Sequence, residues 1–133
     1  MNKVLIVMMN KKPTLELIEI EDVGLEFKQR IIGGRIDCIS FTPDIDIWIH
    51  DEGLYIDSFT PTILFTADHK HEKIIGGIKG TCIITGLEAS TGRSIGLSEE
   101  QIELIKTKLK KNIRVKSNSD SKIYYPLALK WED

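Results

Sequence analysis

The sequence predicts an α+β fold, a mixed but mostly antiparallel sheet of about six to seven strands with two helices packed on one face. Apolar and polar residues alternate along several short segments, two segments have helical spacing instead, and turn signals separate them. The chain has 133 residues, 41% hydrophobic and 29% charged. We therefore expect a single domain over 1–133, with its core over 3–110 and a C-terminal strand extension over 113–131.

The N-terminal third predicts two strands and a helix. Residues 3–9 are apolar and partly β-branched, residues 14–20 alternate, and a short polar turn lies between them. Residues 21–31 have apolar side chains at helical spacing, and Gly33 and Gly34 follow at the position of a C-terminal cap. This segment is predicted to be a short helix.

Residues 44–57, DIDIWIHDEGLYID, predict a β-hairpin. A loop of four residues places Trp48 opposite Tyr55, flanked by Asp46 and Asp57, and a loop one residue shorter would mix the two faces. The opposite face carries the apolar side chains Ile45, Ile47, Ile49, Leu54 and Ile56. Either a helix or a ligand is expected to cover the aromatic pair.

Three further strands are predicted. Residues 35–41 precede the hairpin, and residues 78–85 alternate as one continuous strand. Residues 123–130 form the last strand, where Pro126 lacks a backbone donor and so restricts the strand to an edge or a bulge.

The second helix has the clearest start signal in the chain. It follows a loop or short hairpin over 87–96, and it begins with Ser98 as N-cap and Gln101 at the capping-box position. Its predicted buried stripe consists of Ile102, Ile105 and Leu109.

Composition excludes several classes of partner. Twenty acidic and eighteen basic residues give a formal charge of -2, which argues against binding to duplex nucleic acid. The apolar run over 4–9 is too short to span a membrane, so we expect a cytoplasmic protein. Cys38 and Cys82 lie in alternating apolar stretches and are predicted to be buried structural thiols.

No catalytic or metal site is predicted. Asp68, His69 and His71 form the most metal-like string, because His-x-His on an extended segment places both imidazoles on one side. A third strong ligand at a recognisable spacing is missing, which favours a solvated loop. The chain also contains no Walker loop, dinucleotide fingerprint or nucleophile elbow, so we predict no catalytic residue, metal or cofactor.

Five residues are candidates for ligand binding. Trp48 and Tyr55 offer a stacking surface, while Arg35, Lys79 and Arg93 lie near glycines, and backbone N–H groups of glycines are suited to binding phosphate. The alternative is that the aromatic rings lie under a helix and that the basic residues are ordinary surface.

The order of the short motifs resembles the domain of unknown function 3846 family over residues 3–110. The matching features are the Gly-Gly start of a strand at 33–34, the Asp-Glu-Gly turn at 51–53, the Ile-Gly-Gly strand at 75–77 and the Leu-Ser-Glu-Glu-Gln helix start at 97–101. The resemblance implies an α+β protein of phages and mobile elements, with no chemistry to transfer. The family tends to place a Pro-Asn pair after the turn, and its absence here puts any ligand contact of that asparagine in doubt.

Three functions are consistent with these residues. The leading hypothesis is a non-enzymatic homo-oligomer in the host cytoplasm that sequesters a small nucleotide-like signal of host immunity, a cyclic dinucleotide or ADP-ribose derivative, as an anti-defence protein. The first alternative is a protein-protein inhibitor of a host factor that acts through a sheet edge or the aromatic patch. The second is a metal-dependent hydrolase that uses Asp68, His69 and His71.

Overall fold

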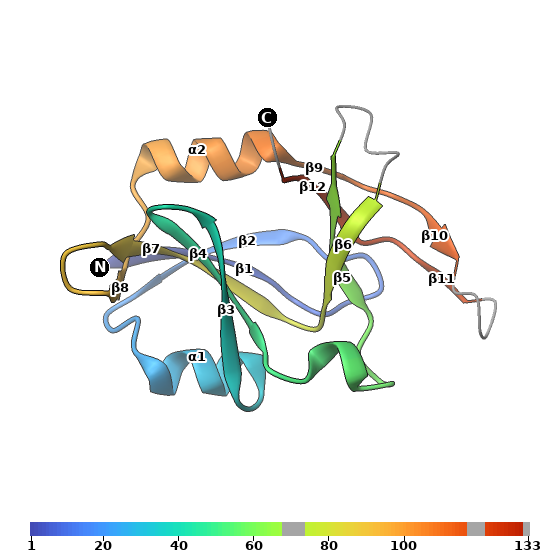
Figure 1. The fold of residues 1–133 in the computed structure, drawn as a ribbon, viewed down its shortest axis with the longest axis horizontal. Helices are drawn as coiled ribbons and strands as arrows, with labels where there is room; N and C mark the ends of the chain where they lie inside the picture. Colours follow the sequence, from blue (N-terminus) through green and yellow to red (C-terminus); the bar gives the residue numbers. More distant parts are fainter. Residues whose placement is uncertain (68–73, 117–121, 132–133) are drawn as a thin grey trace.

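The computed structural model describes residues 1–67, 74–116 and 122–131, and it confirms the α+β class (Figure 1). A six-stranded antiparallel sheet has the order β2-β1-β7-β4-β3, and β8 pairs with β7 outside this path. Its strands are β1 (Asn2–Val7), β2 (Leu15–Ile20), β3 (Ile36–Thr42), β4 (Ile45–His50), β7 (Cys82–Glu88) and β8 (Arg93–Ile95). The strand pair predicted from residues 3–9 and 14–20 is confirmed as β1 and β2, and the short hairpin over 87–96 as β7 and β8.

A second sheet has four strands in the order β6-β5-β12-β9. They are β5 (Pro61–Thr66), β6 (Ile74–Lys79), β9 (Leu109–Asn112) and β12 (Leu127–Lys130), and β12 runs parallel to β5. A separate two-stranded sheet pairs β10 (Val115–Lys116) with β11 (Ile123–Tyr124). Apolar residues of the four-stranded and six-stranded sheets share one core cluster.

Two predicted strands are corrected. Residues 78–85 are not one strand, because Gly80 has a φ of 92° and separates β6 from β7, which belong to different sheets. Residues 123–130 form β11 and β12, and β12 lies between β5 and β9 instead of at an edge. The ladder of β12 with β9 shifts register between Leu127 and Leu129, which agrees with the alternative of a bulge. Pro126 precedes β12, so its missing N–H donor lies outside that strand, and its carbonyl accepts a hydrogen bond from the Ile113 N–H.

The two helices lie on opposite faces of the six-stranded sheet, which corrects the prediction of a single face (Figure 1). α1 (Leu25–Ile32) covers Val4 and Ile6 of β1, while the core cluster that includes α2 (Glu99–Lys108) contains Leu5 and Val7. Successive side chains of a strand point to opposite faces, so an unbroken apolar run needs a covering layer on each side. The continuous run in β1 was the signal for this arrangement.

The predicted hairpin over 44–57 is wrong. β4 pairs with β3 and with β7, where Trp48 lies opposite Cys38 and Ile83. Residues Gly53–Tyr55 form a short 3-10 helix, η1, instead of a strand. A central position satisfies the backbone groups on both edges of β4, whereas an isolated hairpin would satisfy those on only one edge.

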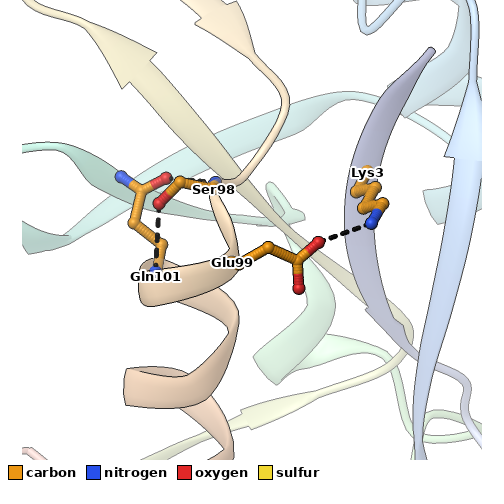
Figure 2. Close-up of polar contacts among 4 residues, drawn as sticks. All are labelled: Lys3, Ser98, Glu99 and Gln101. Atoms are coloured by element: carbon orange, nitrogen blue, oxygen red, sulfur yellow. Dashed lines mark hydrogen bonds and ion pairs between the residues drawn. The ribbon is translucent and has the colours of Figure 1, made fainter.

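The predicted end of α1 and the predicted start of α2 are confirmed by their caps. The first helix begins at Leu25 instead of residue 21, and Leu109 is buried but begins β9 instead of belonging to α2. Gly33 ends α1 with a φ of 92° and donates its N–H to the Gln29 carbonyl at 2.8 Å. At the start of α2, Ser98 and Gln101 form the reciprocal capping box (Figure 2). In the same view, Lys3 of β1 pairs with Glu99, and this contact joins the first turn of α2 to the sheet.

Two neighbouring substitutions in β7 test the placement of the helices. Ile83 belongs to the cluster under α1 and Ile84 to the cluster under α2, and both side chains are buried. Ile83→Ala and Ile84→Ala are each expected to cost about 2 to 5 kcal/mol of unfolding free energy. Hydrogen exchange should accelerate first in α1 for Ile83→Ala and first in α2 for Ile84→Ala. Acceleration of the same helix by both variants would contradict this arrangement.

Candidate functional site

The structure distributes the five predicted ligand-binding residues over three places. Trp48 lies on the α1 side of β4, Arg93 is exposed on β8, and Arg35, Tyr55 and Lys79 border η1. In Figure 1, β8 lies at the left of the molecule and β6 lies right of its centre. Trp48 and Tyr55 are therefore not cross-strand neighbours, and the predicted stacking pair does not form.

A polar cluster lies between α1 and the sheet. The Lys28 ammonium lies 3.6 Å from the centroid of the Trp48 ring and donates to the Ser94 hydroxyl at 2.6 Å. The Trp48 indole N–H donates to the Thr85 hydroxyl at 2.9 Å. Lys28 is only 6% exposed and Asp46 only 5%, so the cluster holds two buried charged side chains. Helix α1 thus covers Trp48, as the alternative interpretation of the aromatic face expected.

Burial controls the titration of this cluster. Removal from water lowers the pKa of Lys28, while the nearby Cys38 and Asp46 oppose that shift. Partial burial of the Cys38 sulfur beside the Asp46 carboxylate raises the pKa of the thiol to about 12. Cys38 nevertheless lies on terminal strand β3 and is exposed, which corrects its prediction as a buried thiol, whereas Cys82 is fully buried as predicted. A thiol that holds its proton is a poor nucleophile.

We define the η1 patch as Arg35, Leu54, Tyr55 and Lys79, because all four lie in η1 or contact the residues beside it. The Arg35 carbonyl accepts from the Asp51 N–H at 2.9 Å, and the Arg35 Nε lies 3.6 Å from the Asp51 carboxylate. The Lys79 ammonium donates to the carbonyl of Ile56 at 3.3 Å. Leu54 and Tyr55 are 62% and 86% exposed.

Gly53 determines how closely η1 approaches β6. A Cβ at this position would lie 2.8 Å from the Lys79 carbonyl oxygen, which is backbone and cannot move aside easily. The residue is buried although its neighbours Leu54 and Tyr55 are exposed. Gly53 therefore anchors the turn while the two following side chains point away from the core.

Two shallow hollows of about 510 Å³ each flank the first turn of α2. Their linings include Asp44 and Glu100 on one side and Lys3 and Glu99 on the other. Glu99 and Glu100 already place negative charge in the first turn, and the Ser98 hydroxyl accepts a hydrogen bond from the Gln101 N–H (Figure 2). These features make this helix start a poor site for an anion.

The described residues contain neither a metal-binding cluster nor a membrane-spanning helix. Within 1–67, 74–116 and 122–131, no group of three or more His, Cys, Asp or Glu side chains is placed to hold a metal ion. Asp68, His69 and His71 lie outside these ranges, so the hydrolase hypothesis stays a prediction. No helix within the same ranges is both long and apolar enough to cross a membrane.

Comparison with known proteins identifies the family. The family model described as "Domain of unknown function (DUF3846)" matches residues 1–110. The chain belongs to the DUF3846 family. No curated protein and no solved structure matches this DUF3846 protein. The matched range contains both the α1 polar cluster and the η1 patch, whereas β12 lies beyond it.

The sequence interpretation of this DUF3846 domain missed Lys28, Thr85 and Ser94. A signal for Lys28 was available, because it lies four residues before Ile32 and so shares the buried face of α1. The contacts of Thr85 and Ser94 had no local signal, since their partners Trp48 and Lys28 are 37 and 66 residues away in the chain.

Proposed function

We propose that this DUF3846 protein is a non-enzymatic binding protein that holds a protein partner through the η1 patch. The observation that carries this proposal is the adjacent exposure of Leu54 and Tyr55, at 62% and 86%. Tyrosine is enriched at protein interfaces because it supplies a large contact area with a polar end at a low entropic cost. An exposed leucine next to it extends the apolar contact.

The backbone of η1 supports this role because it is already ordered. The Tyr55 N–H donates to the Glu52 carbonyl at 2.9 Å, and the Ile56 N–H donates to the Gly53 carbonyl at 3.3 Å. With Gly53 against β6 and Lys79 bonded to Ile56, the turn is held at both ends. A preformed turn loses little conformational entropy on binding, so more of the contact energy contributes to affinity.

The charges at the edge of the patch indicate the chemistry of the partner. The Arg35 side chain is 84% exposed, and its ion pair with Asp51 is long, at 3.6 Å. Such a pair contributes little to stability and is easily exchanged for a carboxylate of a partner. The expected partner therefore has an apolar recess for Tyr55 with an acidic group beside it.

A small nucleotide-like ligand is the second candidate for the same patch. Tyr55 provides one exposed ring for stacking, and Arg35 and Lys79 provide positive charge on either side of the turn. Trp48 is not available as the second ring, because the Lys28 ammonium lies over it. The anti-defence role and the cyclic dinucleotide or ADP-ribose derivative stay predictions.

Affinity capture with matched variants tests the protein-partner proposal. The wild-type chain, Tyr55→Ala and a control, Leu25→Ala, are used as baits, since Leu25 is also apolar and 59% exposed but lies on α1. We expect proteins bound by wild type and Leu25→Ala to be lost with Tyr55→Ala. For a partner then purified, the dissociation constant should rise at least about ten-fold with Tyr55→Ala.

The same variants separate the two candidates. Calorimetric titration of the wild type with cyclic dinucleotides and ADP-ribose derivatives should give no heat if the partner is a protein. Heat that disappears in Tyr55→Ala would favour the nucleotide candidate. Captured proteins that remain bound to both Tyr55→Ala and Leu54→Ala would exclude the η1 patch as the contact surface.

A further inference from the structure

The outer edge of β6 is a second surface with a recognisable partner. β6 is a terminal strand of the four-stranded sheet within the described residues, with β5 as its neighbour. An edge strand presents a row of unpaired backbone N–H and C=O groups, and these groups pair readily with another strand. Natural proteins protect such edges with charged side chains, bulges or very short strands.

Residues 74–78 of β6 lack the charges that the other edge strands carry, although the strand ends on Lys79 and its ladder with β5 shifts register between Ile74 and Gly76. β2 contains Glu16 and Glu19, β3 contains Asp37, and β9 contains two lysines. In contrast, residues 74–78 of β6 read IIGGI and are uncharged. Ile74 and Ile75 are 49% and 52% exposed. This edge is therefore apolar where the others are charged.

The two glycines of β6 leave its backbone accessible. Gly77 lies under the Leu64 side chain of β5, so a Cβ there would be 2.6 Å from the Leu64 Cδ2. Gly76 lies against the Phe65 ring, where a Cβ would be 3.4 Å from the ring carbon, and it is exposed. Packing of β5 thus favours glycine at Gly77, whereas at Gly76 a Cβ would make an ordinary contact. No side chain of either residue obstructs an approaching strand.

We propose that β6 pairs with β6 of a second copy of the chain, antiparallel about a two-fold axis. A register centred on Gly76 places Ile74 of each copy opposite Ile78 of the other, with no charged residue in the shared segment. The two Lys79 residues lie at opposite ends of the pair, where they do not repel each other. The four-stranded sheets of the two copies then form one continuous sheet.

The charge of the chain favours a second copy as the occupant. The formal net charge is only -2, so two copies repel each other weakly. Two-fold dimers are also the commonest closed assembly, and they need a surface that is complementary to itself. An uncharged strand with glycines at its centre meets that requirement. The proposed dimer interface is separate from the η1 patch. The η1 turn contacts β6 at Lys79, where Gly53 packs, whereas the interface uses residues 74–78.

Sedimentation equilibrium of the full chain tests the dimer. The wild type is expected to have twice the chain mass of 15.1 kDa, and Ile75→Lys is expected to have the mass of one chain. The matched control is Leu17→Lys, because Leu17 is 47% exposed on β2, a terminal strand of the other sheet. Leu17→Lys should remain dimeric, while Ile75→Lys should weaken association at least about a hundred-fold through like charges along the pair.

Hydrogen exchange provides a second measurement at the proposed interface. Backbone amides of residues 74–78 should exchange faster in dilute than in concentrated wild type, and faster in Ile75→Lys than in concentrated wild type. Far-UV circular dichroism confirms that each variant is folded. A wild type that is monomeric up to several hundred micromolar would overturn the proposal, and so would a dimer that survives Ile75→Lys. Dissociation of both lysine variants would overturn the assignment to β6.

Discussion

Replacement of Trp48 by alanine is expected to lower the free energy of unfolding by about 3 to 5 kcal/mol. The half-buried ring packs against the cluster under α1, and the Lys28 ammonium lies 3.6 Å from its centroid. The Trp48 indole N–H also donates a hydrogen bond to the hydroxyl of Thr85, which is fully buried. The substitution removes apolar contact and leaves a buried cation and a buried hydroxyl without their ring partner.

Urea denaturation followed by far-UV circular dichroism measures this effect. Trp48→Phe keeps an aromatic face for Lys28 but removes the N–H donor to Thr85, so it should cost less, about 1 to 2 kcal/mol. Tyr55→Ala is the control, because Tyr55 is 86% exposed and its loss should change stability by less than about 0.5 kcal/mol. A loss below about 1 kcal/mol for Trp48→Ala would mean that Trp48 is free for ligand contact.

The second large effect is a loss of stability in alkaline solution caused by Cys82. The side chain is fully buried, and burial raises the pKa of its thiol from 9.0 to about 12, although a hydrogen bond from the Val7 backbone opposes the shift. The folded pKa lies above the unfolded one, so the stabilisation is fully present below pH 9 and is lost as pH rises toward 12. A difference of this size corresponds to a loss on the order of 4 kcal/mol.

Urea unfolding of reduced protein between pH 8 and pH 11 tests the contribution of Cys82. Cys82→Ala is expected to be less stable than wild type at pH 8 because of the cavity, but its stability should fall less between pH 9 and pH 11. Lys28 acts in the opposite direction, since its lowered pKa makes stability rise with pH up to the unfolded value of 10.5. Both wild type and Cys82→Ala contain Lys28, so the difference between their stabilities does not include the contribution of Lys28. Equal slopes for the two proteins would show that the Cys82 thiol does not titrate differently on folding.

The α1 polar cluster and the η1 patch lie in different parts of the structure, so we expect substitutions in the two places to have independent effects. Trp48 and Lys28 hold α1 on the six-stranded sheet, whereas Tyr55 lies on a turn anchored to β6. A substitution of Trp48 or Lys28 should change stability without changing the η1 patch. A substitution at Tyr55 should change binding without changing stability.

The amino-acid sequence alone determined the features that depend on neighbours along the chain. The alternation in residues 14–20 predicted β2, the glycine at 33 predicted the end of α1, and Ser98 with Gln101 predicted the start of α2. Each of these signals acts within a few residues, because side-chain period and capping hydrogen bonds are local. The order of these short motifs also sufficed to recognise the family.

Only the tertiary structure decided which strands pair and which candidate residues meet. β4 pairs with β3 and β7 because a central position satisfies both of its backbone edges, and this choice separates Trp48 from Tyr55. The apolar residues on both faces of β1 and β7 then require one helix on each side of the sheet. These outcomes depend on contacts between residues far apart in sequence, which local patterns do not specify.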